Sequence, residues 1–308
     1  MRKAFVETLE KMAEADDRIM FLTGDLGYQM FEPFKEKFPG RYINCGVAEA
    51  NMVCVAAGLA SEGKRPICYS IGSFMTSRPF EQIKLMLAYH KLPVILIGAG
   101  GGYAYASSGP THHSADDFAL MMLIPGMDVI APGTPQEIRE LLPQLVEFGR
   151  PSYMRIGKFG EPDVTMEPAR LQHMKVIRDS PGDTLVISIG EMLPAVLDAW
   201  EILYVEGHNL PSVWHCHSLR PFDYEMMTEA LMRYRSIVVV EESLPDAAFN
   251  RICSVVACRT ARLARMFRIG PYPGIVLGNP SRESLRYKEG MTPAKIADKL
   301  KAIGRLDD

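Results

Sequence analysis

The chain has 308 residues, which is enough for two domains that each bury a hydrophobic core. Hydrophobic residues make up 47% of it and charged residues 23%, as in an ordinary globular protein. The formal net charge is −3 with acidic and basic residues intermixed, so we expect no nucleic-acid partner. No apolar run approaches the roughly 18 residues of a membrane span, and the charged N-terminus is unlike a signal peptide, so we expect no membrane association.

Six cysteines are spread along the chain. No two of them form a C-x-x-C pair, and none stands at a zinc-like spacing from a histidine. Several lie in apolar runs, where cysteine behaves as a small core residue. We therefore expect reduced thiols, no metal site in this chain and a cytoplasmic location. The six are Cys45, Cys54, Cys68, Cys216, Cys253 and Cys258.

Short apolar runs alternate with helical patterns along the first half of the chain. Each run is bounded by Gly, Pro or polar turn residues, which is typical of strands. This alternation favours an α/β fold in which helices cover both faces of a mostly parallel sheet. The expected strands are Ile19–Thr23, Arg41–Asn44, Ile67–Ile71, Val94–Gly98, Asp128–Ala131 and Ser152–Arg155. The expected helices are Lys3–Ala15, Phe31–Phe38, Asn51–Glu62, Arg78–Tyr89, Ala115–Leu123 and Pro135–Phe148, the last with Thr134 as its N-cap.

Turn-forming residues interrupt this alternation between Gly157 and Asp183. We therefore expect a six-stranded, mostly parallel domain over residues 1–160, a linker over 161–183 and a smaller mixed-sheet domain over 184–308. The strands expected in the second domain are Thr184–Ile189, Ser212–His217, Ser236–Glu241 and Gly274–Leu277. Its expected helices are Met192–Glu206, Tyr224–Tyr234, Ala247–Arg265 and Pro293–Ile303.

The residues best suited to chemistry follow the strands of the first domain. Asp25 follows the first strand, Glu49 follows the second and Phe74 follows the third. A Gly-rich stretch that ends in G-P-T-H-H follows the fourth. In open α/β sheets, ligands collect at the carboxyl ends of the strands. The sequence therefore predicts a site at this edge of the sheet.

Glu49 is the most informative of these residues, because it stands where a short strand and a Gly turn give way to an apolar helix. A carboxyl group shielded from water beside an aromatic residue suits the protonated ring nitrogen of an aminopyrimidine, as in thiamine diphosphate. We expect Val47, Met52 and Val53 to bury it. The alternative is an ordinary acid in the first turn of a helix, where it stabilises the helix dipole.

The other candidates also have ordinary explanations. Phe74 could stack on a flat heterocycle or fill the core. His112 and His113 could bind sugar hydroxyls and relay protons, or they could be solvated loop residues. Arg155 and Arg2 suit an oxyanion such as phosphate, or they are surface charges.

Several segments together resemble the transketolase family. C-G-V-A-E-A-N-M-V-C-V-A-A-G-L-A resembles the family segment around its catalytic glutamate, S-F-M-T-S-R-P-F-E-Q-I its aromatic segment, and G-P-T-H-H-S-A-D-D its G-P-T-H segment. G-D-T-L-V-I-S-I-G-E-M and H-S-L-R-P-F-D extend the resemblance to nearly the whole chain. It implies that residues 1–160 bind the pyrimidine of thiamine diphosphate and that residues 184–308 are a transketolase C-terminal domain.

The resemblance also implies which residues hold the cofactor. Glu49 would be the catalytic glutamate at ring nitrogen N1′. Phe74 would pack on the pyrimidine, and Ile71 stands in the place of an earlier aromatic residue of the family. Asp25 would lie near the thiazolium end of the cofactor, although it is also a common residue in a strand-to-helix turn.

Substrate-binding roles follow in the same way. His112 would be catalytic and would contact the donor's C1 hydroxyl, while His113 replaces a usual Gln beside it. Arg155 and Arg2 would bind the phosphate of the acceptor. Ser108 replaces an Asp that reads donor stereochemistry in many family members, a departure that argues against the usual ketose-phosphate donor.

The family's diphosphate-binding motif is missing from this chain. In the family, G-D-G and a distant Asn hold Mg²⁺ and the diphosphate of the cofactor, and no G-D-G occurs here. The resemblance therefore implies the C-terminal, β-type subunit of a split transketolase, paired with an N-terminal diphosphate-binding subunit in an α2β2-type assembly. It would transfer a two-carbon ketol unit from a ketose-like donor to an aldehyde acceptor, both sugars or sugar-like molecules.

Three other functions stay open at this point. The β subunit of a 2-oxo acid dehydrogenase E1 component shares the domain order and the glutamate. A 1-deoxyxylulose-phosphate-synthase-like activity is also compatible with the motifs. A regulatory subunit that has lost catalysis is the non-enzyme alternative.

Overall fold

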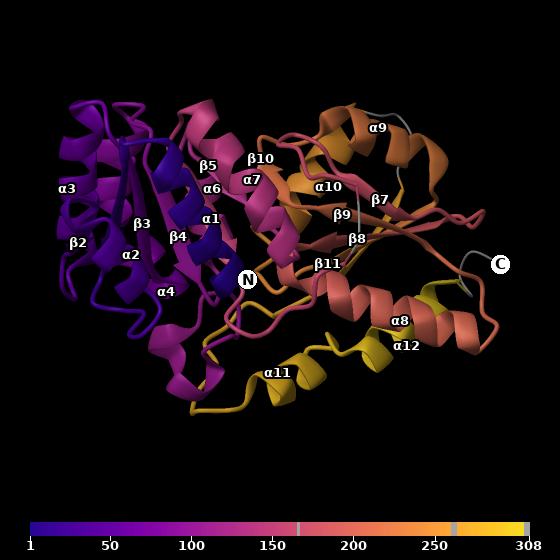
Figure 1. Ribbon diagram of the computed structural model, residues 1–308. Coiled ribbons are helices and arrows are strands. Elements are labelled where there is room, and N and C mark those ends of the chain that lie inside the picture. The colour runs from indigo at the N-terminus through magenta and orange to yellow at the C-terminus, as the bar shows by residue number, and fades with distance from the viewer. Residues whose placement is uncertain (165–166, 260–263, 305–308) are drawn as a thin grey trace.

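The computed structural model describes residues 1–164, 167–259 and 264–304. The chain forms two α/β units side by side, each with a mostly parallel sheet between layers of helices (Figure 1). The strand order is β10-β5-β6-β4-β3-β1-β2 in the seven-stranded sheet and β12-β11-β8-β9-β7 in the five-stranded sheet. The expected α/β architecture, with a larger first sheet and a smaller mixed second sheet, is confirmed.

The first unit contains the seven-stranded sheet. Its strands are β1 (Ile19–Thr23), β2 (Tyr42–Asn44), β3 (Arg65–Ile71), β4 (Ile95–Ala99), β5 (Asp128–Ile130), β6 (Ser152–Ile156) and β10 (Ser218–Arg220). Its helices are α1 (Arg2–Ala15), α2 (Glu32–Lys37), α3 (Glu49–Ser61), α4 (Gly72–Ser77), α5 (Phe80–Gln82), α6 (Asp117–Met122) and α7 (Pro135–Phe148). Short turns of other helix types are η1 (Pro39–Arg41), η2 (Ile83–Ala88), η3 (Ala106–Ser108) and η4 (Pro110–His112). The hydroxyl of Thr134 caps α7 as expected.

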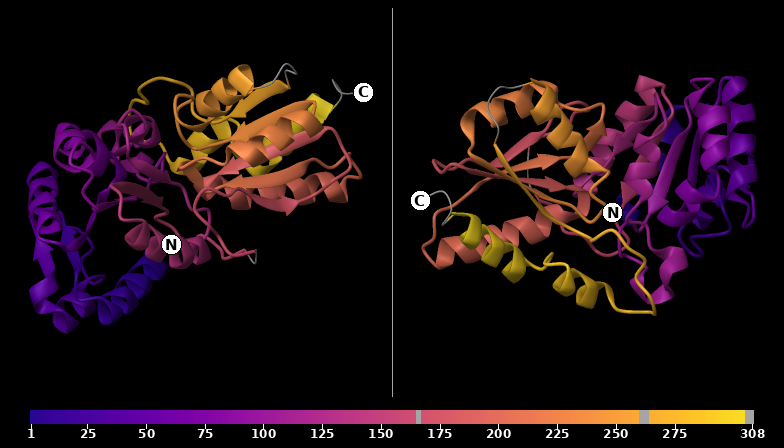
Figure 2. Two further views of the ribbon diagram at one scale, coloured as in Figure 1. Left: turned by 90° about the horizontal axis from the view of Figure 1, so that it is seen from above. Right: turned by 180° about the vertical axis from the view of Figure 1, so that it is seen from behind.

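The second unit contains the five-stranded sheet. Its strands are β7 (Lys175–Arg178), β8 (Thr184–Ile189), β9 (Ser212–Cys216), β11 (Ser236–Val240) and β12 (Arg265–Ile269). Its helices are α8 (Leu193–Val205), α9 (Tyr224–Arg233), α10 (Ala248–Arg259), α11 (Arg282–Lys288) and α12 (Pro293–Gly304), with the turn η5 (Gly190–Met192) before α8. Figure 2 shows that α8 and α12 run together on one face of this sheet, opposite α9 and α10.

Three groups of buried apolar side chains hold these layers together. One lies between the first sheet and helices α1, α2 and α7, and another lies between the second sheet and α8, α11 and α12. The third covers the remaining faces of both sheets and is continuous from α3 and α6 to α9 and α10. Because burial of apolar surface is the main favourable term in folding, this shared core couples the two units.

Several elements differ from the sequence-based expectation. The first sheet has seven strands, not six, because β10 crosses from the second unit and pairs antiparallel with β5. Strand β7 lies inside the expected linker and pairs antiparallel with β9. No strand forms at Gly274–Leu277, where Gly and Pro residues favour turns, and the edge strand is β12 instead. Helices α4 and α11 are additions to the expected set, and part of the Ala247–Arg265 helix lies outside the described residues.

Two further expectations concern cysteines and membranes. All six cysteines are free thiols. Among the described residues, no helix has the length and apolar character needed to cross a bilayer.

Candidate active site

The candidate site lies at the carboxyl edge of the first sheet, where β1, β2, β3 and β4 end next to one another. These four strands are parallel, so the segments that follow them emerge on the same side. Asp25 follows β1, Glu49 follows β2 and Phe74 follows β3. His112 lies in the loop after β4.

Glu49 is the first residue of α3, and its carboxylate is buried at this edge. The residue is 2% exposed. The hydroxyl of Ser70, on β3, donates to Oε1 at 2.9 Å, and Nη1 of Arg78 donates to Oε2 at 2.8 Å. A Cβ on Gly24 would lie 3.3 Å from Oε1, so a glycine there keeps the carboxylate uncrowded. One oxygen is thus held from inside the sheet and the other from the rim of the site.

The apolar surroundings expected for Glu49 are present in part. Met52 and Val53 on α3 are buried, as expected. Val47 is not, because it sits at the tip of the turn that Gly46 and Ala48 close with a backbone hydrogen bond, and its side chain is 71% exposed.

Phe74, in α4, is contacted from two directions. The guanidinium carbon of Arg78 lies 3.7 Å from the centre of its ring. The ring of His112 lies 4.9 Å away between centroids, at an interplanar angle of 62°. Arg78 keeps helical backbone angles just after α4, so its position four residues beyond Phe74 puts both on one helix face. The structure therefore brings Glu49, Phe74 and His112 together around Arg78.

Burial lowers the pKa of His112, and the neighbouring Arg78, His113 and Lys158 lower it further, which favours the neutral imidazole near pH 7. Its Nδ1 lies 2.9 Å from the hydroxyl of Thr111. A neutral ring can both donate and accept a hydrogen bond, which suits a residue that handles hydroxyl protons.

His113 faces its own loop. Its Nε2 lies 3.1 Å from the backbone oxygen of Ala106, and its ring packs edge-on against Tyr103. Ser108 is exposed at the end of η3 in the same loop. The substrate-binding roles of His113 and Ser108 stay predictions.

Asp25 and Ile71 frame the site on the β1 and β3 sides. The Oδ1 of Asp25 accepts a hydrogen bond from the side-chain amide of Asn44 at 2.8 Å, and the backbone N–H of Asp25 donates to Oδ1 of Asn44 at 3.1 Å. Asp25 is exposed and has a positive φ of 59°, a conformation that Asp tolerates in turns. Ile71 is buried at the end of β3, next to α4. Their cofactor-binding roles stay predictions.

Arg155, on β6, is already paired within the chain. Its Nε donates to Asp117 at 2.8 Å, and its terminal nitrogens donate to Asp117 and to the backbone oxygens of Ser114 and Glu242. Its guanidinium also lies 3.7 Å from the ring centre of Phe118. Although burial opposes the charge, Asp117 holds the pKa of Arg155 above its usual value. Arg155 therefore ties the site loops to the second unit, and phosphate binding by it stays a prediction.

Arg2 and Lys158 place positive charge at the same end of the molecule. Lys158 lies 3.9 Å from the ring centre of Tyr105, in the loop that carries His112. Burial lowers the pKa of Lys158, and the positive charges of Arg2 and Arg282 lower it further. No sequence motif marks Lys158, although its place two residues after β6 puts it at the carboxyl edge of the sheet.

The residues of this edge fit one end of thiamine diphosphate. A buried carboxylate beside an aromatic ring suits a flat, protonated aminopyrimidine. The residues do not assemble a magnesium site. Among the described residues, one group of side chains is close enough together to hold a metal ion. It consists of Glu137, His215 and His217 and lies away from this edge, at the boundary between the two units.

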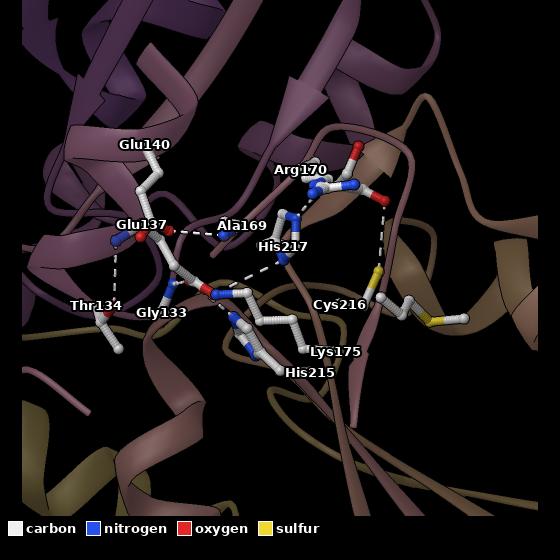
Figure 3. Close-up of polar contacts among 12 residues, drawn as sticks. Gly133, Thr134, Glu137, Glu140, Ala169, Arg170, Lys175, His215, Cys216 and His217 are labelled. Carbon is white, nitrogen blue, oxygen red and sulfur yellow. Dashed lines mark hydrogen bonds and ion pairs between the residues drawn. The ribbon is translucent and has the colours of Figure 1, made fainter. Parts of the chain in front are cut away.

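Lys175 contacts the same carboxylate, and the four residues together are called the boundary cluster (Figure 3). The carboxylate of Glu137, from α7, meets Nζ of Lys175 at 3.0 Å, Nε2 of His215 at 3.1 Å and Nδ1 of His217 at 3.7 Å. Burial alone would raise the pKa of Glu137, but the two histidines and the lysine hold it well below its usual range. Burial lowers the pKa of His217 to about 4.

Sequence reasoning does not reveal this boundary cluster. Its one local signal is the H-C-H spacing of His215 and His217, since Glu137 and Lys175 are far away in the chain. The three metal-compatible side chains point at one another, but the ammonium of Lys175 already supplies a positive charge to the carboxylate. The cluster joins α7 of the first unit to β7 and β9 of the second, so its evident role is structural.

Comparison with known families covers both units. The transketolase pyrimidine binding domain family matches residues 1–159, and the transketolase C-terminal domain family matches residues 172–279.

Individual relatives agree with these matches. The 6-deoxy-6-sulfo-D-fructose transketolase subunit SqwH of Clostridium sp. (strain MSTE9) is 34% identical over 79% of this chain and 76% of that protein. An apulose-4-phosphate transketolase subunit of Phocaeicola vulgatus is 32% identical over 78% of each. A solved structure of a split-gene transketolase, an inactive β4 tetramer, superposes with a TM-score of 0.86 at 26% identity, covering 98% of this chain and 96% of that one. The chain therefore belongs to the transketolase family and carries the family's pyrimidine-binding and C-terminal domains.

Proposed function

We propose that this chain is the β-type subunit of a split, thiamine-diphosphate-dependent transketolase, and that Glu49 is its catalytic acid. One observation carries the proposal: a buried carboxylate, an aromatic ring and a histidine gather around Arg78 at the carboxyl edge of a parallel sheet. When bound, thiamine diphosphate supplies the carbon nucleophile that carries the transferred two-carbon unit. Transfer runs from a ketose-like donor to an aldehyde acceptor.

Glu49 would hold a proton on the pyrimidine nitrogen N1′. The carboxyl group is suited to this because burial keeps water from taking the proton, and because Ser70 fixes Oε1 at 2.9 Å. Oε2 is the oxygen that faces the rim, where it meets Arg78. Phe74 would support the flat ring from one side, with Asp25 and Ile71 further along the cofactor.

His112 would exchange protons with substrate hydroxyls, which its lowered pKa allows near neutral pH. His113 and Ser108 would line the same channel. Arg2 and Lys158 would attract an anionic group on the substrate, such as a phosphate or a sulfonate. The two named relatives act on a sulfosugar and a sugar phosphate by their names, in keeping with an anionic sugar here. Arg155 could reach such an anion only by releasing Asp117.

The diphosphate and Mg²⁺ would be held by an N-terminal transketolase subunit. The two relatives are named as subunits, and the solved split-gene β tetramer is inactive. We therefore expect an α2β2-type heterotetramer, with the active site between the two kinds of subunit. We also expect it in the cytoplasm, where its six free thiols would stay reduced.

The test is reconstitution. The chain is co-purified with the diphosphate-binding transketolase subunit of the same genome and assayed with thiamine diphosphate, Mg²⁺ and a panel of ketoses with and without terminal phosphate or sulfonate. We expect turnover that requires both subunits and the cofactor. Glu49→Gln is the matched inactive control, because it keeps the size of the side chain.

Two outcomes would overturn the proposal. One is a complex that binds no thiamine diphosphate, which would favour a regulatory subunit. The other is acyl transfer or decarboxylation of 2-oxo acids without ketol transfer, which would favour a dehydrogenase component or a synthase.

A further inference from the structure

Arg78 occupies the place that the proposed function assigns to the aminopyrimidine ring. Its guanidinium is planar, carries delocalised positive charge and has N–H donors along its edge. Nη1 donates to Oε2 of Glu49 at 2.8 Å, while the guanidinium carbon lies 3.7 Å from the ring centre of Phe74. Those are the two contacts, one with the acid and one with the aromatic face, that a protonated aminopyrimidine would need.

A third observation places the same guanidinium beside the substrate histidine. The charge of Arg78 is among the causes that lower the pKa of His112, and the rings of His112 and Phe74 are 4.9 Å apart. Arg78 therefore lies among all three residues of the candidate site. Ser70 contacts the other carboxylate oxygen, Oε1, so it does not compete with Arg78 for Oε2.

The arginine, and not the glutamate, is the partner that can move away when another cation takes over the carboxylate. The side chain of Arg78 is 41% exposed, whereas that of Glu49 is 1% exposed. A partly exposed ion pair is weak, and the arginine side chain has several rotatable bonds that lead to solvent. Glu49, by contrast, starts a helix and is fixed from behind by Ser70. The pair therefore opens by movement of the arginine.

We propose that Arg78 is a stand-in for the cofactor: its guanidinium stacks on Phe74 and pairs with Glu49 until the aminopyrimidine displaces it. The inference rests on the proposed function, because it assumes that these two residues receive the pyrimidine. Its physical benefit is that the buried carboxylate always has a cationic partner, since an unpaired buried charge is strongly destabilising. Its consequence is competition, because the cofactor and Arg78 cannot both make these contacts.

The test is binding of free thiamine, which carries the pyrimidine without the diphosphate, to the full chain. Arg78→Met removes the guanidinium but keeps a flexible apolar side chain. We expect thiamine to bind about tenfold more tightly to this variant than to the unmodified chain, a change equivalent to about 1.4 kcal/mol. Dissociation constants come from ligand-observed NMR titrations, and a circular dichroism spectrum and melting curve confirm that each variant is folded.

A matched control exists on the same unit. Arg150 is 45% exposed, pairs with buried Asp128 and lies 4.4 Å from the ring centre of Phe148. Arg150→Met therefore removes the same kind of contact away from the site and leaves thiamine binding unchanged. Arg78→Lys is the second variant should Arg78→Met fold poorly. It keeps the charge but loses the planar group, and thiamine should bind more tightly to it than to the unmodified chain.

Displacement also has a direct readout. In the unmodified chain, the side-chain NMR signals of Arg78, assigned by comparison with Arg78→Met, should shift toward those of a solvated arginine as thiamine is added. Signals of Arg150 should stay in place.

The outcomes separate this inference from the proposed function. Equal or weaker thiamine binding by Arg78→Met, together with unmoved Arg78 signals, overturns the stand-in role. That result leaves the proposed function intact if Glu49→Gln and Phe74→Ala still weaken binding. If neither of those variants changes thiamine binding, the pocket itself is wrong and both proposals fail.

Discussion

Two buried glutamates of this protein lie in the first turns of helices at the edge of a sheet, yet their surroundings differ in one respect. Glu137 is neutralised by Lys175, whose side chain is 7% exposed, and contacts two histidines that are fully buried. Among the described residues, Glu49 pairs with one cation, Arg78, whose side chain is 41% exposed. The first carboxylate is thus enclosed by its partners, and the second is covered by a side chain that reaches in from solvent.

This difference separates a structural acid from one available for chemistry. Removing a partner from Glu137 leaves an uncompensated charge buried between the two units. The partner of Glu49, by contrast, is a side chain that reaches the solvent and can be exchanged for another cation. Burial is common to both glutamates, so the feature that supports the proposed catalytic role of Glu49 is its partly exposed partner.

Glu49→Gln tests the functional side of the comparison and should have the largest effect. An amide cannot hold the proton that the pyrimidine nitrogen requires, so we expect turnover of the reconstituted complex to fall by about 10² to 10⁴-fold. Stability should change little, because Gln can still accept the hydrogen bond from Ser70. Turnover is measured at saturating thiamine diphosphate, and subunit association by gel filtration. Near-normal turnover would rule out the acid role of Glu49.

Glu137→Gln tests the structural side. The change leaves the ammonium of Lys175 buried without its counter-charge, so we expect a loss of about 3–5 kcal/mol in the free energy of unfolding, measured in urea. Glu137→Gln combined with Lys175→Met should recover part of this loss, because it removes the orphaned charge. A surface control, Asp179→Asn, breaks an exposed pair with Arg233 and should cost less than about 1 kcal/mol. A small effect of Glu137→Gln would contradict the structural role.

The same cluster predicts acid sensitivity. Burial lowers the pKa of His217 to about 4, below the 6.5 of an unfolded histidine. The unfolded state therefore binds more protons between these two values, and the folded state loses stability as the pH falls through that window. The loss should approach about 3 kcal/mol by pH 4 and be absent above pH 7.

Urea unfolding of the chain at pH 7, 5.5 and 4.5 checks this window. His217→Asn should make stability less dependent on pH in this window, since the Asn side chain is polar but does not titrate. Glu137 also stabilises the folded state, because its pKa is lowered there. That stabilisation is lost only as the pH falls below about 4.5, the ordinary pKa of an unfolded glutamate. If the free energy of unfolding of His217→Asn falls just as steeply with pH, another group is responsible for the acid sensitivity.

The candidate site is predictable from the sequence because its residues follow successive strands. Periodicity places Asp25, Glu49 and Phe74 after β1, β2 and β3, and parallel strands bring these positions to one edge. The carboxylate geometry of Glu49 is not predictable in this way. Arg78 lies within the aromatic segment that resembles the family, but only the fold shows that its guanidinium turns back toward a residue 29 positions earlier.

Pairs between residues far apart in the chain are what sequence reasoning does not foresee. Arg155 has the sequence context of an anion ligand, a role that stays a prediction, but its pair with Asp117, 38 positions away, is visible only in the fold. The segment of β7 resembles a linker because Gly and Pro residues surround it, and its short run pairs only at the sheet edge beside β9. Lys175 on that strand completes the Glu137 cluster, which therefore cannot be foreseen either.

Lys158→Met tests the positive charge that Lys158 places near Arg2 beside the candidate site, and it should have the smallest effect. Lys158 is partly exposed and near Arg2, so its pull on a substrate anion is screened by water and by salt. We expect KM for a phosphorylated or sulfonated sugar to rise about fivefold, with kcat unchanged, because the charge contributes equally to substrate and transition-state binding. KM for an uncharged sugar should not change.

The control is Lys3→Met, which changes the residue next to Arg2 in α1, a lysine whose side chain is 91% exposed and pairs with Glu7. It removes the same charge from a position away from Lys158 and the Tyr105 loop, so KM should stay at the unmodified value. Raising the salt concentration should shrink the difference between Lys158→Met and the unmodified enzyme, since screening already weakens the attraction that the variant removes. A KM that rises equally for charged and uncharged sugars would show that Lys158 shapes the loop around Tyr105 and does not recognise an anion.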